Sequence, residues 1–200
     1  MVSAVIYIEG GGDRDENLAR LFRRAWTKFF EAAGLEGRMP RVVRGGGRAR
    51  TFDLFQTAIG NPRRGRIPLL LVDSEADVAA GHSAWRHLQA RDGWDRPESA
   101  RDDQVFLMVQ VMETWLVADR NTLRRYFGAQ FRENTLRQWP DLEDVPKHGV
   151  LDALARATAG CARRYAKGEV SFELLERIDP AHVEAECPHA RALLNCLRTI

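Results

Sequence analysis

The chain has 200 residues, which is enough to bury a hydrophobic core and fits one domain, or one domain with a small appendage. Apolar residues make up 44% and charged residues 29%, and this balance excludes a disordered or fibrous chain. The net charge is +2, so the total charge by itself does not indicate a partner.

Cysteine usage and the N-terminal residues bear on the cellular compartment. The three cysteines show no CxxC spacing, which argues against a zinc site and against a disulfide framework. The first residues run directly into VSAVIYIEG, without the features of an export signal, and no apolar run reaches the length of a membrane-spanning helix. We therefore expect a cytoplasmic protein without a membrane anchor, and we leave an oligomer open.

The first part of the chain alternates short apolar runs with amphipathic stretches. Residues 2–8 form an apolar run that stops at Glu9 and three glycines, which is typical of a buried strand. Between Asp13 and Ala33, apolar residues recur three and four apart, which predicts a helix that Gly34 ends. Further strands are expected near 40–44, over 66–72 and over 104–112, and helices over 51–59 and 82–90. Such alternation predicts an α/β fold with a parallel sheet covered on both faces.

The second part of the chain has a different pattern. Helices are expected over 121–127, 150–159, 171–178 and 190–197, with prolines and a glycine in the turns and no strand-like run. We therefore divide the chain into an α/β domain over residues 1–120 and a helical C-terminal extension over residues 121–200 that packs on it.

Charge is unevenly distributed along the α/β part. Residues 38–66 contain eight arginines and one acid, whereas residues 73–119 contain ten acids and four arginines. A basic stretch beside an acidic one suits a protein that holds a polyanion with one surface and metal with another, although two ordinary solvated faces would give the same pattern. The residues expected to contact a nucleic-acid backbone are Arg44, Arg48, Arg50, Arg63 and Arg64.

Acidic residues follow the predicted strands, where ligands of open parallel sheets collect. Glu9 ends the first strand, Asp73, Glu75 and Asp77 follow the third, and Glu113 follows the fourth. In an extended segment, the three acids after the third strand would point to one side, and their repulsion calls for a cation or for basic neighbours. Carboxylate oxygens suit Mg²⁺ or Mn²⁺. Alternatively, these acids cap the following helices and lie in solvent.

Two segments carry a resemblance to a known domain. VIYIEGGGDRDE followed by IPLLLVDSEAD resembles the Toprim domain of topoisomerases, primases and the overcoming-lysogenisation-defect (OLD) family of nucleases. The stretches QVMETWLVAD and YAKG more narrowly resemble an uncharacterised Toprim-related bacterial family, often encoded beside ABC-type ATPases in presumed phage-defence loci. The resemblance implies a Toprim-like (Rossmann-like) three-layer parallel sheet with a helical C-terminal part.

The resemblance also implies roles for individual residues. Glu9 would be a metal ligand or general acid-base, and Asp73 and Glu75 would bind metal, with Glu75 departing from the aspartate of the pattern. Lys167 would stabilise charge on phosphate, although a solvated lysine needs no role. The full set of metal ligands expected is Glu9, Asp13, Asp73, Glu75, Asp77 and Glu113.

These observations lead to three hypotheses about function. The first is a Mg²⁺- or Mn²⁺-dependent nuclease that cleaves DNA or RNA, acting as an effector in anti-phage defence with an ATPase partner. The second is a Toprim-like regulatory or nucleic-acid-binding subunit that does not cut. The third is a phosphotransfer domain of the receiver or phosphatase type, which Glu9 fits poorly because a nucleophilic aspartate is needed there.

Overall fold

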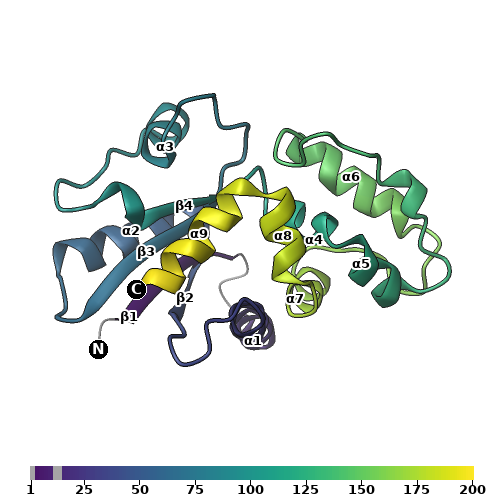
Figure 1. The fold of residues 1–200 in the computed structure, drawn as a ribbon, viewed down its shortest axis with the longest axis horizontal. Helices are drawn as coiled ribbons and strands as arrows, with labels where there is room; N and C mark the ends of the chain where they lie inside the picture. The colour runs from purple at the N-terminus through teal and green to yellow at the C-terminus, as the bar shows by residue number, and fades with distance from the viewer. Residues whose placement is uncertain (1–2, 11–14) are drawn as a thin grey trace.

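A computed structural model describes residues 3–10 and 15–200 and contains one parallel sheet. Its strand order is β2-β1-β3-β4 (Figure 1). The strands are β1 (Ser3–Glu9), β2 (Arg41–Gly46), β3 (Arg66–Asp73) and β4 (Val105–Met108). All three neighbouring pairs are parallel, which confirms the predicted fold class.

The central strand β3 explains why the apolar runs are continuous rather than alternating. Leu69 and Leu71 join the core on one face of the sheet, whereas Leu70 and Val72 join a second core on the other face. All four side chains are fully buried. A strand covered on both faces needs apolar residues at every position, which is the pattern that the sequence shows over 69–72.

Helices cover both faces of the sheet and complete three layers. On one face lies α1 (Glu16–Ala32), which Asp15 caps by accepting hydrogen bonds from the backbone N–H groups of Asn17 and Leu18. The opposite face is covered by α2 (Arg48–Gly60) and α3 (Ala84–Asp92).

The chain that follows β4 is helical and shares a core with the sheet. It contains α4 (Glu113–Ala118), α5 (Arg120–Phe127), α6 (Lys147–Ala157), α7 (Glu169–Leu175), α8 (Pro180–Glu186) and α9 (Pro188–Thr199). Single 3₁₀ turns span Asp102–Gln104 and Glu133–Thr135. One cluster of buried residues includes Ala4 in β1, Trp26 in α1 and Leu197 in α9. In Figure 1, α9 returns across the sheet while α4 to α8 lie on the side toward which the strands run.

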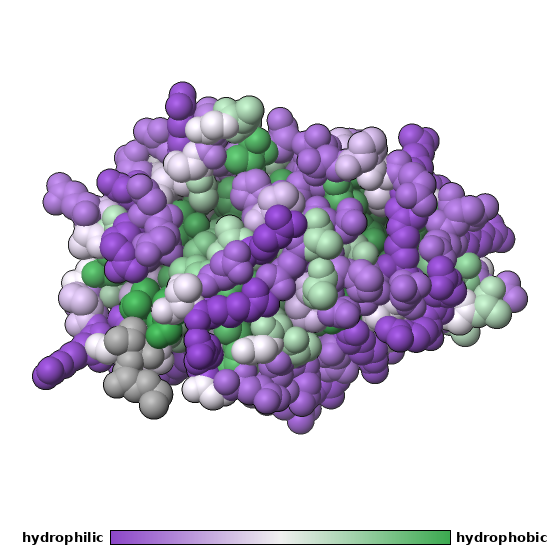
Figure 2. Space-filling view, in the orientation of Figure 1, coloured by the Kyte–Doolittle hydropathy of each residue, from purple (hydrophilic) through white to green (hydrophobic). Residues whose placement is uncertain are grey.

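The molecular surface on the side seen in Figure 1 is mostly polar. Figure 2 shows hydrophilic side chains over most of it, interrupted by small apolar patches alongside α9. Within the described ranges, the chain forms no helix that is both long and apolar enough to cross a membrane.

The predicted strand over 104–112 is shorter in the structure. Gln104 belongs to a 3₁₀ turn, β4 ends at Met108, and the chain then turns through a cis Val109–Gln110 peptide before Glu113 begins α4. Val109 and Val111 are nonetheless buried. An apolar run marks burial, and burial alone does not separate a strand from the buried turn that follows it.

Candidate functional site

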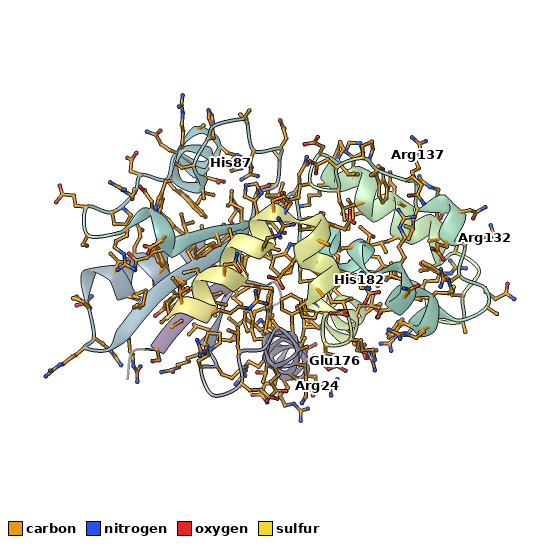
Figure 3. All side chains as sticks on the ribbon, in the orientation of Figure 1. Arg24, His87, Arg132, Arg137, Glu176 and His182 are labelled. Carbon is orange, nitrogen blue, oxygen red and sulfur yellow. The ribbon has the colours of Figure 1, made fainter. Side chains whose placement is uncertain are left out.

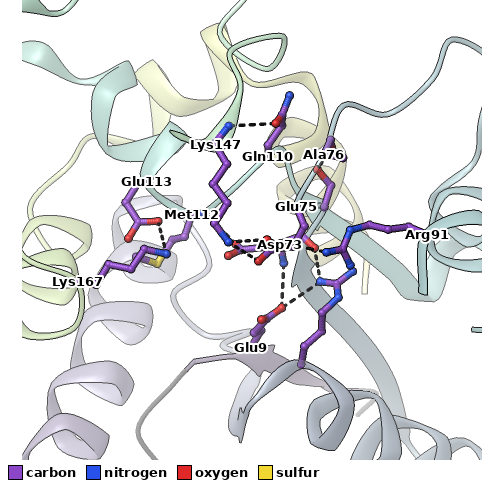
Figure 4. A network of polar contacts seen from close by, with 12 residues as sticks. Glu9, Asp73, Glu75, Ala76, Arg91, Gln110, Met112, Glu113, Lys147 and Lys167 are labelled. Carbon is purple, nitrogen blue, oxygen red and sulfur yellow. Dashed lines mark hydrogen bonds and ion pairs between the residues drawn. The ribbon is translucent and has the colours of Figure 1, made fainter. Parts of the chain in front are cut away.

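Three carboxylates predicted to bind metal meet at the carboxyl ends of two neighbouring strands. Oxygen atoms of Glu9, Asp73 and Glu75 lie within 4.8 Å of one another, and we call these residues the acidic group (Figure 4). Glu9 ends β1 and Asp73 ends β3, and the register pairs Ile8 with Leu71. The two strands therefore bring acids that are far apart in the sequence to one edge of the sheet.

Backbone hydrogen bonds fix these carboxylates. The backbone N–H of Asp73 donates to Oε2 of Glu9 at 3.3 Å, and Oδ1 of Asp73 accepts from the backbone N–H of Met112 at 2.9 Å. Glu75 has a φ of 64°, and its N–H donates to the carbonyl of Gln110 at 2.8 Å. A left-handed backbone at a residue other than glycine is costly and tends to occur at functional sites.

Burial and crowding shift the proton affinity of two of these carboxyls. Burial raises the pKa of Asp73 well above its usual value, and the nearby charges of Glu9 and Glu113 raise it further. Burial also raises the pKa of Glu9, although Arg48 opposes that shift. Negative charge is thus concentrated where water is partly excluded, an arrangement that additional positive charge would stabilise.

Arg48, at the start of α2, forms one wall of the site. Its guanidinium lies 3.2 Å from Oε2 of Glu9 and 2.7 Å from Oδ2 of Asp92, and it also donates to the backbone carbonyl of Asp73. The same group lies 4.9 Å from the centre of the Trp94 ring. We predicted a contact between Arg48 and nucleic acid; that contact stays a prediction, and in the structure this side chain is bound to carboxylates inside the site.

Lys147, in the first turn of α6, forms a second wall that sequence reasoning missed. Its Nζ donates to both carboxylate oxygens of Glu75, at 2.6 and 2.5 Å, and its backbone N–H donates to Oε1 of Gln110. The guanidinium of Arg91 lies 4.0 Å from the same carboxylate. One feature of the sequence could have indicated Lys147: it stands at the N-terminus of a helix. The helix dipole disfavours a cation there unless an acidic residue pairs with it.

Glu113 lies beside the acidic group but outside it. It is 3% exposed, and its Oε1 accepts from the hydroxyls of Tyr165 at 2.5 Å and Ser171 at 3.4 Å. Burial and the Glu113 charge raise the pKa of Tyr165, so the phenol keeps its proton and donates it. Lys167 Nζ lies 3.7 Å from Oε2 of Glu113, and the Lys167 charge also lowers the pKa of Asp73, which brings Lys167 to the rim of the site.

The remaining predicted residues are distributed as follows. Asp77 is exposed and does not belong to the acidic group, and Asp13 lies outside the described residues. Arg63 and Arg64 are exposed in the turn between α2 and β3, at the end of the sheet opposite the acids. Arg44 lies in the edge strand β2, and Arg50 lies in the first turn of α2. Figure 3 shows how widely charged side chains are spread over the molecule.

The chemistry of the acidic group suits a divalent cation. Its members supply carboxylate oxygens from rigid strand ends, which Mg²⁺ and Mn²⁺ prefer as ligands. Arg48 and Lys147 already compensate part of the negative charge. The three carboxylates therefore form a group able to hold a metal ion.

Comparisons with known proteins identify a family for this chain. No curated protein matches it, and no solved structure matches it. A family model described as "Domain of unknown function (DUF4276)" matches residues 8–198, which include the acidic group and α1 to α9 apart from the last residue of α9. The chain therefore belongs to the DUF4276 family.

Proposed function

We propose that this protein is a metal-dependent nuclease that hydrolyses phosphodiester bonds of DNA or RNA. The observation that carries the proposal is the convergence of Glu9, Asp73 and Glu75 within 4.8 Å at the carboxyl edge of a parallel sheet. The resemblance of these positions to the Toprim nucleases supports it further.

In this proposal Glu9, Asp73 and Glu75 would hold Mg²⁺ or Mn²⁺. A bound divalent ion supplies Lewis acidity and lowers the pKa of bound water. Glu9, which the resemblance gives the role of metal ligand or general acid-base, would in the second role take the proton released by the attacking water. Lys167, with a side chain 51% exposed at the rim, would hold a phosphate oxygen.

A second candidate function is supported by the basic walls of the site. Arg48 binds Glu9 and Lys147 binds both oxygens of Glu75, so two protein cations already occupy positions around the carboxylates. A nucleic-acid-binding or regulatory subunit that does not cut would retain such a closed network. The two functions differ in whether Mn²⁺ binds the acidic group and whether substrate is cleaved.

Cleavage by matched variants tests the proposal. Plasmid, single-stranded DNA and RNA are incubated with the wild-type chain, Glu9→Gln, Asp73→Asn or Asp77→Asn, each in Mg²⁺ or Mn²⁺. Asp77 is the control, because it is an exposed acid outside the acidic group. We expect Glu9→Gln and Asp73→Asn to lose about 100-fold or more in rate, as several kcal/mol of transition-state stabilisation is removed.

The outcomes separate the two candidate functions. Equal cleavage by all variants would exclude the acidic group as the reaction centre. No cleavage by the wild type, together with nucleic-acid binding, would favour the non-catalytic subunit. The ATPase partner and the role in phage defence are part of the proposal, and copurification with an ATPase encoded by a neighbouring gene would test them.

A further inference from the structure

Two hollows line the edge of the sheet formed by β2. The larger, about 520 Å³, lies between α2 and the strands β1, β2 and β3. The smaller, about 330 Å³, lies between α1, β2 and the start of α2. Arg41 and Val43 of β2 line both hollows, which therefore adjoin at the edge strand, and we call the two together the arginine groove.

The arginine groove is strongly basic. Six of its lining residues are arginines and none is acidic; the arginines are Arg23, Arg41, Arg44, Arg50, Arg63 and Arg66. Arg41, Arg63 and Arg66 are exposed, and within the described part of the chain none of the three forms an ion pair through its side chain. A concave surface that presents three exposed arginines without ion-pair partners among the described residues matches a polyanion.

The floor of the larger hollow is apolar and contains an aromatic ring. Val5, Tyr7, Val43, Leu54 and Pro68 line it. The face of a nucleobase can stack on an aromatic side chain when the base is free, whereas bases in a duplex are already stacked on one another. The combination of an apolar floor with an arginine rim therefore fits unpaired nucleotides better than a double helix.

The strands that line the groove end near the acidic group. Val5, Tyr7 and Glu9 alternate along β1, and the rise of a strand sets Tyr7 about 7 Å and Val5 about 13 Å from Glu9. At the other side, Arg44 and Gly46 line the smaller hollow, and both bond to Gly10, the residue after Glu9. A single strand bound along the groove would thus have its end within a few nucleotides of the carboxylates.

We propose that the arginine groove binds single-stranded nucleic acid, with phosphates on Arg41, Arg63 and Arg66 and a base on Tyr7. This inference rests on the proposed function, because it names the form of substrate that reaches the same site. Arg41 and Arg66, which lie in the strands β2 and β3, and Tyr7 were not among the residues expected to contact nucleic acid.

Binding is measured without metal, so that it does not depend on cleavage. The 200-residue chain is titrated in EDTA against fluorescent single-stranded DNA, single-stranded RNA and duplex DNA. The test variant carries Arg41→Ala, Arg63→Ala and Arg66→Ala. The matched control removes three exposed arginines from the helical part, Arg132→Ala, Arg137→Ala and Arg156→Ala; Figure 3 shows Arg132 and Arg137 at the end of the molecule away from the sheet.

We expect the test variant to bind single strands about tenfold more weakly and the control variant to bind like the wild type. The slope of log affinity against log salt should fall by about 2, because three phosphate contacts are lost. Tyr7→Leu keeps an apolar side chain but removes stacking, and should weaken single-strand binding about tenfold with little effect on any duplex binding.

Several outcomes would contradict the proposed binding site. Equal loss of affinity in the test and control variants would show that net charge alone explains the binding, and absence of wild-type binding to any single strand would exclude the site. A polyglutamate peptide that binds where oligonucleotides do not would assign the surface to an acidic protein. If the groove variant binds normally while Asp73→Asn still abolishes cleavage, single-strand binding by the groove is contradicted and the nuclease proposal is supported. If the groove variant loses binding while neither the wild type nor any variant cleaves, single-strand binding by the groove is supported and the nuclease proposal is contradicted.

Discussion

At the scale of single residues, the carboxylates of the acidic group are already bound to side-chain cations, with which a metal ion would compete. Lys147 holds both oxygens of Glu75, and Arg48 holds Glu9. A divalent ion would have to displace the ammonium or share Glu75 with it. Lys147 thus sets how readily the acidic group accepts metal.

Replacing Lys147 should therefore strengthen metal binding. In Lys147→Gln the carboxylate of Glu75 loses its ammonium partner, and we expect Mn²⁺ to bind about tenfold more tightly, equivalent to about 1.4 kcal/mol. Isothermal titration calorimetry at pH 7 measures this. Lys28→Gln is the control, because Lys28 pairs with Glu31 on the exposed side of α1. Unchanged Mn²⁺ affinity in Lys147→Gln would show that the ammonium does not compete.

Asp73 makes the stability of the protein depend on pH. Its pKa is raised in the folded state, so the folded chain holds a proton that the unfolded chain releases, and stability falls as pH rises above the usual carboxyl pKa of 3.8. In EDTA, Asp73→Asn should remove part of this pH-dependent loss of stability. The melting temperature at pH 7 should then rise by about 2–4 °C for each kcal/mol gained in the free energy of unfolding.

Thermal denaturation between pH 5 and pH 8, without metal, measures the effect of Asp73. Asp77→Asn serves as the control and should leave the melting temperature close to that of the wild type, because Asp77 is exposed. A lower melting temperature for Asp73→Asn at pH 7 would mean that the negative charge of Asp73, which strengthens the hydrogen bond donated by the Met112 N–H, stabilises the fold more than burial and repulsion destabilise it.

At the scale of elements, the end of β1 is constrained by packing at Gly10. A Cβ atom at this position would lie 2.4 Å from a ring carbon of Phe22, which is fully buried in α1. The strand end that carries Glu9 therefore lies against the first helix, and only glycine permits this approach. The sequence alone suggested a tight turn for the glycines that follow Glu9, whereas the close ring contact required the structure.

Gly10→Ala should destabilise the protein by about 1–3 kcal/mol, because the buried ring has to move. The control is Gly60→Ala at the end of α2, where an added Cβ meets no atom within 4 Å. Alanine there should be neutral or stabilise by up to about 1 kcal/mol. Urea denaturation of both variants measures the difference, and an equal free energy of unfolding for Gly10→Ala and the wild type would contradict the packing argument.

At the scale of the whole molecule, the sheet and the helical C-terminal part depend on one core. Leu193, Leu194 and Leu197 of α9 are 0–2% exposed and belong to the same buried cluster as Ile6 of β1. The helix that ends the chain thus covers the sheet on which the acidic group is built. Residues 1–120 and 121–200 share this core.

Shortening one of these leucines should weaken the whole fold. Leu194→Ala removes fully buried atoms and should cost about 2–5 kcal/mol, in a single cooperative transition that includes the α/β part. Asn195→Ala, at the exposed neighbouring position, is the control. Two separate transitions in calorimetry, with only one shifted by Leu194→Ala, would show that the parts fold independently.

The sequence by itself determined the α/β class, the positions of β1, β2 and β3 to within a few residues over the described part of the chain, and the meeting of Glu9 with Asp73 and Glu75. Hydrophobic periodicity is a local property, and a parallel sheet aligns the carboxyl ends of its strands, so these features follow without coordinates.

Only the tertiary structure decided which cations face the acids and which polar groups support them. Lys147, Asp92 and Tyr165 reach the site from α6, α3 and the loop before α7, segments distant from β1 and β3 in the sequence. For Lys147 the only local signal is its place at a helix N-terminus, which does not name its partner. Asp92 and Tyr165 carry no local signal, because a single aspartate or tyrosine in the sequence looks the same on a solvated surface as in a site. Long-range packing of the C-terminal helices against the sheet creates these contacts, and that packing is a property of the folded chain as a whole.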